Sequence, residues 1–293
     1  MTQQGWLAGE FEQHRPHLRA VAYRILGSLS EADDAVQDAW LRFSRADSSE
    51  VQNLGGWLTT VVARVALNML RSRNTRRELP LDVHVPDPII DRVDGTDPQH
   101  EALLADSVGL ALLVVLETLT PPERLAFVLH DMFAVPFEEI ARILERSPEA
   151  ARQLASRARR RVRGAVAAPD ADLGAQRAIV EAFLAASREG DFDALVALLH
   201  PDVVLRADGG AVPGLSHRVQ GAESVAGRAL MFRRVDLRIH HALVNGTPGL
   251  LSTRDEELFS VMGLAITGGQ ITEMNILVDP ERLRRLDVTI LGG

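Results

Sequence analysis

The chain has 293 residues, of which 46% are hydrophobic and 25% charged, and it carries a net charge of −8 and no cysteine. That length supports two or three domains with separate cores, and that composition excludes a disordered chain. The lack of cysteine excludes a disulfide framework and a cysteine-ligated zinc site. The N-terminal segment is too charged for a signal peptide, and no apolar run has the length of a membrane span. We therefore expect a cytoplasmic protein that does not bind membranes.

Residues 1–77 predict a domain of three helices. Ser30, with Asp33 three residues later, is typical of the start of the second helix, and the third is expected to run from Trp57 to Arg71. The second helix has an apolar face toward the core. The residues expected on its other face are Asp34, Gln37, Asp38 and Leu41.

Residues 78–101 predict a linker, because they hold four prolines and a net charge of −6 from seven acidic residues and one arginine. Helical patterns return over 102–164. There Thr120-Pro121-Pro122-Glu123 predicts a helix start with a capping box. The segments 136–144 and 148–163 predict two helices joined by a short turn, which indicates a helix-turn-helix.

Residues 172–293 predict an α+β domain. Two amphipathic helices around Phe183 and Leu195 come first, and hydrophobic residues then alternate with polar ones, as is typical of strands. Two such segments flank Thr267-Gly268-Gly269-Gln270, which favours a hairpin. The chain is therefore expected to be multidomain, with two all-α helical domains followed by helices packed on a curved antiparallel sheet.

The second helix of the helix-turn-helix is rich in arginine, with six in the twelve residues 152–163. In such motifs the N-terminal residues of this helix reach base edges in the major groove, while others contact phosphates. We expect Arg152, Gln153 and Ser156 to read bases. The residues expected at phosphates are Arg157, Arg159, Arg160, Arg161 and Arg163.

The predicted third helix begins with an aromatic residue, Trp57, and is basic. Its arginines, with those that follow it, are Arg64, Arg71, Arg73, Arg76 and Arg77. An aromatic ring beside arginine is what unpaired DNA requires, but a tryptophan at a helix start is also typical of a core. The spacing leaves both interpretations open.

Three segments resemble the sigma-70 family of transcription initiation factors. GSLSEADDAVQDAWLR is similar to its region 2, GGWLTTVVARVALNMLRSRNTRR to the DNA-melting helix of that region, and LETLTPPERLAFVLHDMFAVPFEEIARILERSPEAARQLASRARRRVR to region 4. The likeness covers about 10–163 in the family's order and is typical of the extracytoplasmic-function group. It implies a factor that binds core RNA polymerase and directs it to promoters.

The resemblance also implies contacts with core polymerase. Asp34, Gln37 and Asp38 would bind the coiled coil of the β′ clamp, and region 4 would meet the β flap. The acidic linker would thread the polymerase cleft that otherwise takes nucleic acid, which gives its charge a purpose.

On promoter DNA, the resemblance implies that Trp57, Arg64 and Asn68 keep the strands apart at the minus-ten element. Arg71 and Arg73 would lie on the same DNA, and the loop 48–56 would hold a flipped base. At the minus-thirty-five element, the bases would be read by Arg152, Gln153 and Ser156.

Residues 172–293 resemble the cone-shaped, SnoaL-like domains of the NTF2-like superfamily, through FLAASREGDFDALVALLHPDVVLRADGG and the C-terminal strands. A subgroup of sigma factors carries such a domain behind region 4, and its cone is a candidate site for a small-molecule ligand. The subgroup has two motifs with counterparts here. Asp208-Gly209-Gly210 precedes Ala211, where another glycine is common, and Asp279-Pro280-Glu281-Arg282-Leu283 stands where the subgroup has Asn-Pro-Asp-Lys-Leu.

We expect these two motifs to regulate the chain by touching the sigma domains or the linker. Arg282, Arg284 and Arg285 are expected to pair with linker acids such as Asp87 or Asp91.

Two other functions fit parts of the sequence. A ligand-responsive helix-turn-helix regulator that never binds core polymerase would not need the region 2 segment. An NTF2-like enzyme tethered to DNA would need an acid or base in its cone. The candidates are His200, Asp202 and Asp208. Because the only tyrosine, Tyr23, lies in another domain, a Tyr–Asp oxyanion pair is excluded. Because His240 and His241 are adjacent on a strand, they point to opposite faces. We expect no catalytic site, no metal and no cofactor.

Overall fold

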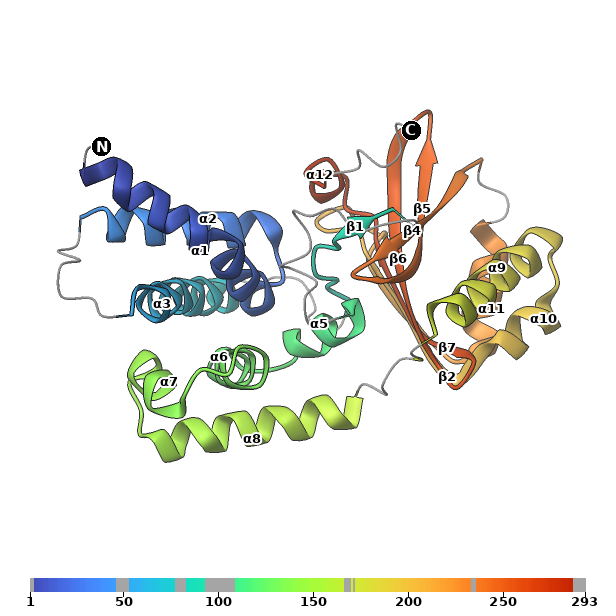
Figure 1. Ribbon diagram of the computed structural model, residues 1–293. Coiled ribbons are helices and arrows are strands. Elements are labelled where there is room, and N and C mark those ends of the chain that lie inside the picture. Colours follow the sequence, from blue (N-terminus) through green and yellow to red (C-terminus); the bar gives the residue numbers. More distant parts are fainter. Residues whose placement is uncertain are drawn as a thin grey trace. The chain divides into compact units, whose positions relative to one another are not determined.

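The computed structural model describes residues 3–45, 53–76, 83–92, 109–165, 170, 172–232 and 236–286, which divide into two compact units (Figure 1). Unit 1 comprises Met1–Glu78, Glu101–Asp106 and Leu116–Ala165. Unit 2 comprises Leu79–His100, Ser107–Val115 and Val166–Gly293. The two helical parts of the chain therefore share one unit, and the linker belongs to the other. None of the described helices has the length and apolarity needed to cross a membrane.

Unit 1 begins with helices α1 (Gln3–Leu26), α2 (Leu29–Phe43) and α3 (Leu54–Arg76). The prediction of Ser30 as the cap of the second helix is wrong. The cap is Ser28, whose extended backbone (φ −131°, ψ 129°) directs its hydroxyl to accept from the Glu31 N–H, and the helix starts two residues earlier than expected.

Helix α3 also starts earlier than predicted, at Leu54 in place of Trp57, and it continues to Arg76. The side-chain oxygen of Asn53 accepts a hydrogen bond from the Gly56 N–H at 3.0 Å. Asparagine in this position satisfies a helix N–H that would otherwise have no partner, which explains the earlier start.

The second helical part consists of α5 (Leu110–Glu117), α6 (Pro121–Phe127), a π-helical turn η2 (Val128–Met132), α7 (Phe137–Leu144) and α8 (Pro148–Ala165). The predicted link between Thr120 and Glu123 is present, since the backbone N–H and hydroxyl of Thr120 both donate to Glu123 Oε2, at 3.2 and 2.8 Å. Helix α7 ends at Leu144, and the residue that caps it, Glu145, adopts left-handed backbone angles (φ 56°). The predicted helix-turn-helix is therefore confirmed.

Buried arginines join the two helical parts inside unit 1. Arg124, 2% exposed, donates to Glu117 Oε1 at 2.6 Å and to the carbonyl oxygen of Arg24 at 3.3 Å. The guanidinium of Arg24 lies 4.8 Å from the ring centroid of Phe133, and His17 meets the same ring edge-on. Buried charges need such partners, so these contacts hold the two parts in one arrangement.

Unit 2 is built on a seven-stranded sheet of order β1-β4-β5-β6-β7-β2-β3. Its strands are β1 (Ile90–Asp91), β2 (Leu199–Asp208), β3 (His217–Gln220), β4 (Arg238–Val244), β5 (Thr247–Arg254), β6 (Glu257–Thr267) and β7 (Gln270–Leu277). Its helices are α9 (Leu173–Glu189), α10 (Phe192–Leu198), α11 (Ala222–Phe232) and α12 (Pro280–Leu283). The α+β class is confirmed.

Two details of the sheet bear on the sequence predictions. The hairpin is present, with Gly268 and Gly269 both at positive φ (60° and 78°), as a tight turn requires. The sheet is not wholly antiparallel, because β2 pairs with β7 in parallel.

The helices α9, α10 and α11 gather on one side of the curved sheet (Figure 1). Phe183 of α9, Leu195 of α10 and Val225 of α11 are buried there together with sheet residues such as Leu264 and Met274. This core fixes the sheet, and the sheet in turn positions the edge strands and loops described below.

Candidate functional site

One face of α2 is solvent-exposed and acidic. Ala35, Val36 and Ala39 are buried, whereas Asp34 and Gln37 are exposed and Asp38 is half-buried. The remaining member of the predicted face is Leu41, which is 43% exposed. Among the described residues, the side chain of Asp38 accepts only from Arg42, at 2.9 Å in an exposed ion pair. The structure therefore brings the four predicted residues together on a surface that the fold itself does not use.

The aromatic residue of α3 packs on the core and is also partly exposed. Trp57 is half-buried, with its ring 5.9 Å from that of Phe43, which continues a cluster with Phe11 and Trp40. Exposed Arg64, Asn68 and Arg71 continue from Trp57 along one stripe of the helix, at spacings of seven, four and three residues.

Arg73 differs from the expectation that it lies on DNA. Its side chain is 18% exposed, donates to the carbonyl oxygen of Leu26 at 3.1 Å, and forms ion pairs with Glu31 and, at 3.9 Å, with Glu117. These partners are far away in the sequence, so spacing could not reveal them. Arg73 is occupied inside unit 1.

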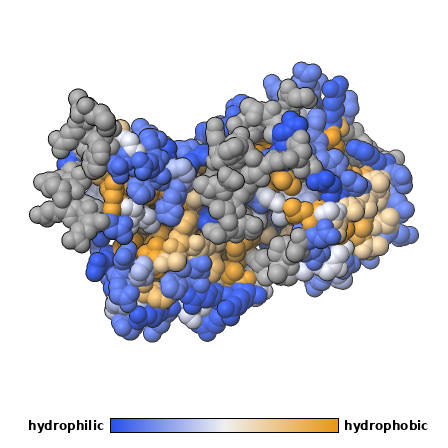
Figure 2. All heavy atoms as spheres, viewed as in Figure 1, coloured by the Kyte–Doolittle hydropathy of each residue, from blue (hydrophilic) through white to orange (hydrophobic). Residues whose placement is uncertain are grey.

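The predicted DNA-reading side of α8 is exposed. The helix packs through its small residues Ala151, Ala155 and Ala158, each 0% exposed. The opposite side carries only exposed polar residues, and the surface over α8 is mostly hydrophilic (Figure 2). These are Arg152, Gln153, Ser156, Arg157 and Arg160.

The arginines of α8 differ in what holds them. Arg152 bonds to Glu138 at 2.9 Å and lies 5.5 Å from the ring centroid of Phe137. Arg157 and Arg161 both contact Glu123 at 3.0 Å. Burial would raise the pKa of Glu123, but hydrogen bonds from Thr120 and these arginines outweigh it and lower that pKa below its usual value. Arg160 forms no hydrogen bond or ion pair with any described residue.

The linker lies on unit 2. Its strand β1 pairs antiparallel with β4, so Ile90 lies opposite Val244. Beside this pair the Ile89 N–H donates to Asn245 Oδ1 at 3.2 Å, and the Asn245 N–H donates back to the Ile89 carbonyl oxygen at 2.8 Å. Val85, Ile89 and Ile90 are buried. The linker thus adds Ile90–Asp91 to the sheet as an edge strand, and its flanking residues pack on the same unit.

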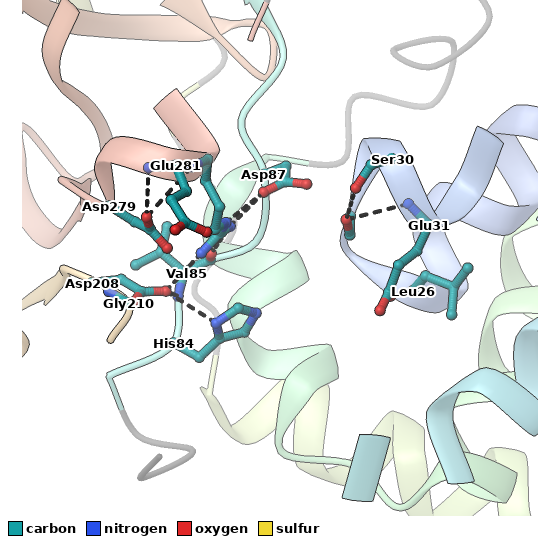
Figure 3. Close-up of polar contacts among 12 residues, drawn as sticks. Leu26, Ser30, Glu31, His84, Val85, Asp87, Asp208, Gly210, Asp279 and Glu281 are labelled. Atoms are coloured by element: carbon teal, nitrogen blue, oxygen red, sulfur yellow. Dashed lines mark hydrogen bonds and ion pairs between the residues drawn. The ribbon is translucent and has the colours of Figure 1, made fainter. Parts of the chain in front are cut away.

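A single arginine fastens the preceding residues of the linker. Arg282 donates to Asp87 at 2.7 Å, to Asp208 at 2.8 Å and to the Val85 carbonyl oxygen at 2.6 Å. Asp208 also accepts from the Val85 N–H at 2.9 Å and contacts His84 Nδ1 at 3.0 Å (Figure 3). We call these five residues the linker clamp. The expected pair of Arg282 with Asp87 is confirmed.

Burial would raise the pKa of Asp208, whose side chain is 4% exposed. The hydrogen bond from His84, the charge of Arg282 and the N–H of Val85 outweigh burial and hold that pKa far below its usual value. Asp208 therefore stays ionised, and its charge is compensated only while the clamp is formed.

The two regulatory motifs meet in the structure. Gly210 adopts a positive φ of 59°, and a Cβ there would lie 2.1 Å from a carboxylate oxygen of Asp279. A Cβ on Gly209 would clash with Leu215 at 2.2 Å. Asp279 in turn caps α12 by accepting from the Glu281 N–H at 2.9 Å, with Pro280 in the first turn. Gly210 is therefore needed for the close packing of the two motifs, and Gly209 for the close approach of Leu215.

The candidates for catalysis have the following surroundings. His200 Nδ1 accepts from the backbone N–H of Asp202, and Asp202 is exposed. His240 is 3.0 Å from Thr253 Oγ1. Asp208 faces the linker. Among the described residues, no three His, Asp or Glu side chains are placed to hold a metal ion.

Sequence models of three families match the chain: sigma-70 region 2 over residues 11–76, sigma-70 region 4 over 109–162, and a SnoaL-like domain over 180–272. The chain is 44% identical over 218 residues to the ECF RNA polymerase sigma factor SigJ of Mycobacterium tuberculosis, covering 74% of the chain and 70% of the relative. It is 34% identical to the probable ECF RNA polymerase sigma factor SigI of the same species over the full length of both. The crystal structure of M. tuberculosis SigJ matches with a TM-score of 0.77 and 34% identity, covering 96% of this chain and 100% of that one.

Proposed function

The chain belongs to the extracytoplasmic-function sigma factors, which bind core RNA polymerase and start transcription at promoters, and from this premise we propose how its two units perform and control that task. The full-length relatives and the region 2 match favour this function over a regulator that never binds core polymerase. We assign residues 1–77 to region 2, 78–101 to the linker, 102–164 to region 4 and 172–293 to the SnoaL-like domain.

We propose that the exposed face of α2 binds core polymerase. Asp34, Gln37 and Asp38 would contact the β′ clamp coiled coil, and region 4 would contact the β flap. The support is that this acidic face contributes little to the fold, since its described ion pair with Arg42 is exposed.

Promoter DNA would be bound by the stripe of α3 and by α8. Exposed Arg64, Asn68 and Arg71 would contact the strands at the minus-ten element beside Trp57. Arg73 would join them only if its ion pairs with Glu31 and Glu117 were released.

Two variants of α8 test how it reads the minus-thirty-five element. Arg152→Ala is expected to weaken binding of the cognate promoter by about 1–3 kcal/mol and to relax its specificity, as for a base contact. Arg160→Ala is expected to weaken all sequences alike and to reduce the salt dependence, as for a phosphate contact. Binding of both variants to a promoter library at several salt concentrations measures this. Identical behaviour of the two across the library would contradict the division into base and phosphate contacts.

The packing of region 2 on region 4 supports a restrained free state. Elements centred at minus ten and minus thirty-five lie roughly 85 Å apart along B-DNA, at 3.4 Å per base pair. A compact unit the size of unit 1 has a radius of gyration of about 14 Å. The two regions would therefore have to separate before both elements could be bound.

We propose that the SnoaL-like domain restrains the sigma factor in cis by holding the linker. The observation that carries this is Arg282, which binds Asp87 and Asp208 at once. A linker whose acids Asp87 and Asp91 are 7% and 1% exposed cannot present those charges to the polymerase cleft. Because the domain is tethered, even weak contacts act at a high local concentration.

We also propose that this domain is regulatory and not catalytic. The relatives are named for transcription, and the buried acid with the strongest claim to act as a base, Asp208, is already bound by Arg282 at 2.8 Å and by His84 at 3.0 Å. Turnover of a substrate by the full chain that is lost in Asp208→Asn would contradict this.

A further inference from the structure

Unit 2 encloses a cavity of about 880 Å³ between the sheet and helices α9 and α11. Its wall is mostly apolar, with residues such as Phe183, Leu205, Leu250, Met262 and Ile276. Protein cores pack with few voids larger than a water molecule, whereas small-molecule sites have volumes of this order. The domain core is therefore built around a space that its own described side chains do not fill.

Strand register shows that one wall of the cavity is a row of residues running across the strands. Ala207 lies opposite His217 on β3 and opposite Ile276 on β7, Ile276 lies opposite Met262 on β6, and Met262 lies opposite Leu250 on β5. Directly paired residues point to the same face of a sheet, so these five residues form one row, and all five line the cavity. Four strand spacings make the row about 19 Å long, with a polar residue only at its β3 end.

That polar end contains a positive charge that has no counter-ion in the described part of the chain. Arg228 of α11 contacts only His217 Nδ1, at 3.4 Å, and no carboxylate among the described residues lies within 4 Å of its guanidinium. Its Nε is buried and has no acceptor in the described part of the chain. Leaving a buried charged donor unpaired is costly, so this group calls for an anion.

His217 adds a second unpartnered atom at the same place. Its Nδ1 lies 3.0 Å from the Leu215 carbonyl oxygen, and because that oxygen can only accept, Nδ1 carries the proton. Burial, and then the charge of Arg228, lower the pKa of His217, so the ring is neutral near pH 7. Its Nε2 is buried with no partner among the described residues and presents a lone pair.

We propose that this cavity binds an apolar carboxylic acid of the fatty-acid type. The carboxylate accepts from Arg228, whose fork of N–H groups matches two carboxylate oxygens, and the hydrocarbon lies along the row toward Leu250. A hydroxyl near the carboxylate donates to Nε2 of His217.

The same cavity reaches helix α12, which carries the clamp residue Arg282. Pro280, Leu283 and Leu286 line it, and Leu283 is 4% exposed, while the adjacent Arg282 grips the linker. A ligand that packs on Leu283 while Arg282 holds the linker stabilises the closed state of the clamp. This step rests on the proposed cis regulation, whereas the binding step does not.

The binding step is tested with cis-parinaric acid, a fluorescent long-chain carboxylate, titrated into the full chain. We expect saturable binding, and we expect Arg228→Met to weaken it by about tenfold or more because a charge-assisted contact is lost. The matched control is Arg218→Met on β3, the strand of His217, where Arg218 is exposed and among the described residues bonds only to Gln220. It should leave the affinity within about twofold, as for other exposed polar contacts. Equal affinity in Arg228→Met and the unchanged chain, with both folded by thermal melting, would overturn the proposal.

Further variants separate the two steps. Met262→Trp fills the row and should abolish binding of the acid and of the matching long-chain alcohol, whereas Arg228→Met should spare the alcohol. A chain cut after Leu286 should bind the probe as before, and a rise in affinity of about tenfold would mean that residues 287–293 are the occupant instead.

In run-off transcription with core polymerase, the probe should lower output from the full chain but not from Arg282→Met. Binding without any effect on transcription would remove the coupling and leave the site.

Discussion

Replacing Asp34 and Asp38 by arginine is expected to abolish binding of the chain to core RNA polymerase. The reason is electrostatic, because reversing two charges at a complementary interface places like charges together and costs several kcal/mol. The fold should survive, since both residues lie on the exposed side of α2 and such substitutions change stability by only about 0.5 kcal/mol. Copurification with core polymerase and run-off transcription measure the effect, and circular dichroism checks the fold.

A control with the same change in charge separates a specific contact from a change in net charge. Glu181→Arg with Asp193→Arg places two exposed reversals on α9 and α10 of unit 2. This variant should bind core polymerase as the unchanged chain does. If the double variant on α2 keeps full polymerase affinity, the assignment of that face is wrong, whereas the family assignment still rests on the relatives.

Local signals in the sequence predicted most of the architecture. These signals depend on neighbours within four residues, so they can be recognised in the sequence alone. They are the capping residues Thr120 and Glu123, the break before Pro148 and the glycine pair 268–269. The errors at helix starts were also local. Ser28 and Asn53 both cap helices, whereas the sequence signals predicted a cap at Ser30 and a start at Trp57, a few residues later.

Contacts between residues far apart in the chain could not be predicted from the sequence. Arg73 has the same helical setting as Arg71, yet it pairs with Glu31 and Glu117, and only tertiary packing decides which of two arginines turns inward. The parallel pairing of β2 with β7 has the same cause, because it joins segments some 70 residues apart. The strand β1 in the linker is only two residues long and carries no periodic signal.

The regulatory motifs were predicted in part. Charge complementarity indicated that Arg282 would meet a linker acid, but not that Asp208 would share the same guanidinium. The departures from the subgroup's motif keep its chemistry in this structure. Asp279 caps α12 as asparagine can, and arginine in place of lysine keeps the cation while adding donors that reach the Val85 carbonyl oxygen.

Breaking the clamp is expected to free the linker and raise transcription. Arg282→Met leaves Asp208 and Asp87 without their cation, at side-chain exposures of 4% and 10%. Losing one partner of a buried pair costs about 3 kcal/mol or more, which is roughly a hundredfold in the ratio of held to released linker. Run-off transcription with core polymerase should therefore rise several-fold, and a chain cut before Asp279, which lacks α12, should behave in the same way.

The position of the linker can be measured directly, because the chain has no cysteine and labels can be attached to cysteines introduced at Asp94 and Glu181. The distance distribution between the labels should broaden in Arg282→Met. The matched control is Arg206→Met, which breaks the Arg206–Glu273 pair at 3.0 Å, with side chains of similar burial and no linker contact. It should destabilise unit 2 without changing the label distances or the transcript yield. A linker held by Arg282 cannot also lie in the polymerase cleft, so releasing it should change transcription. Three chains test this: Arg282→Met, the chain cut before Asp279 and a chain cut before Asp170. If all three match the full chain in transcription, the SnoaL-like domain does not regulate in cis.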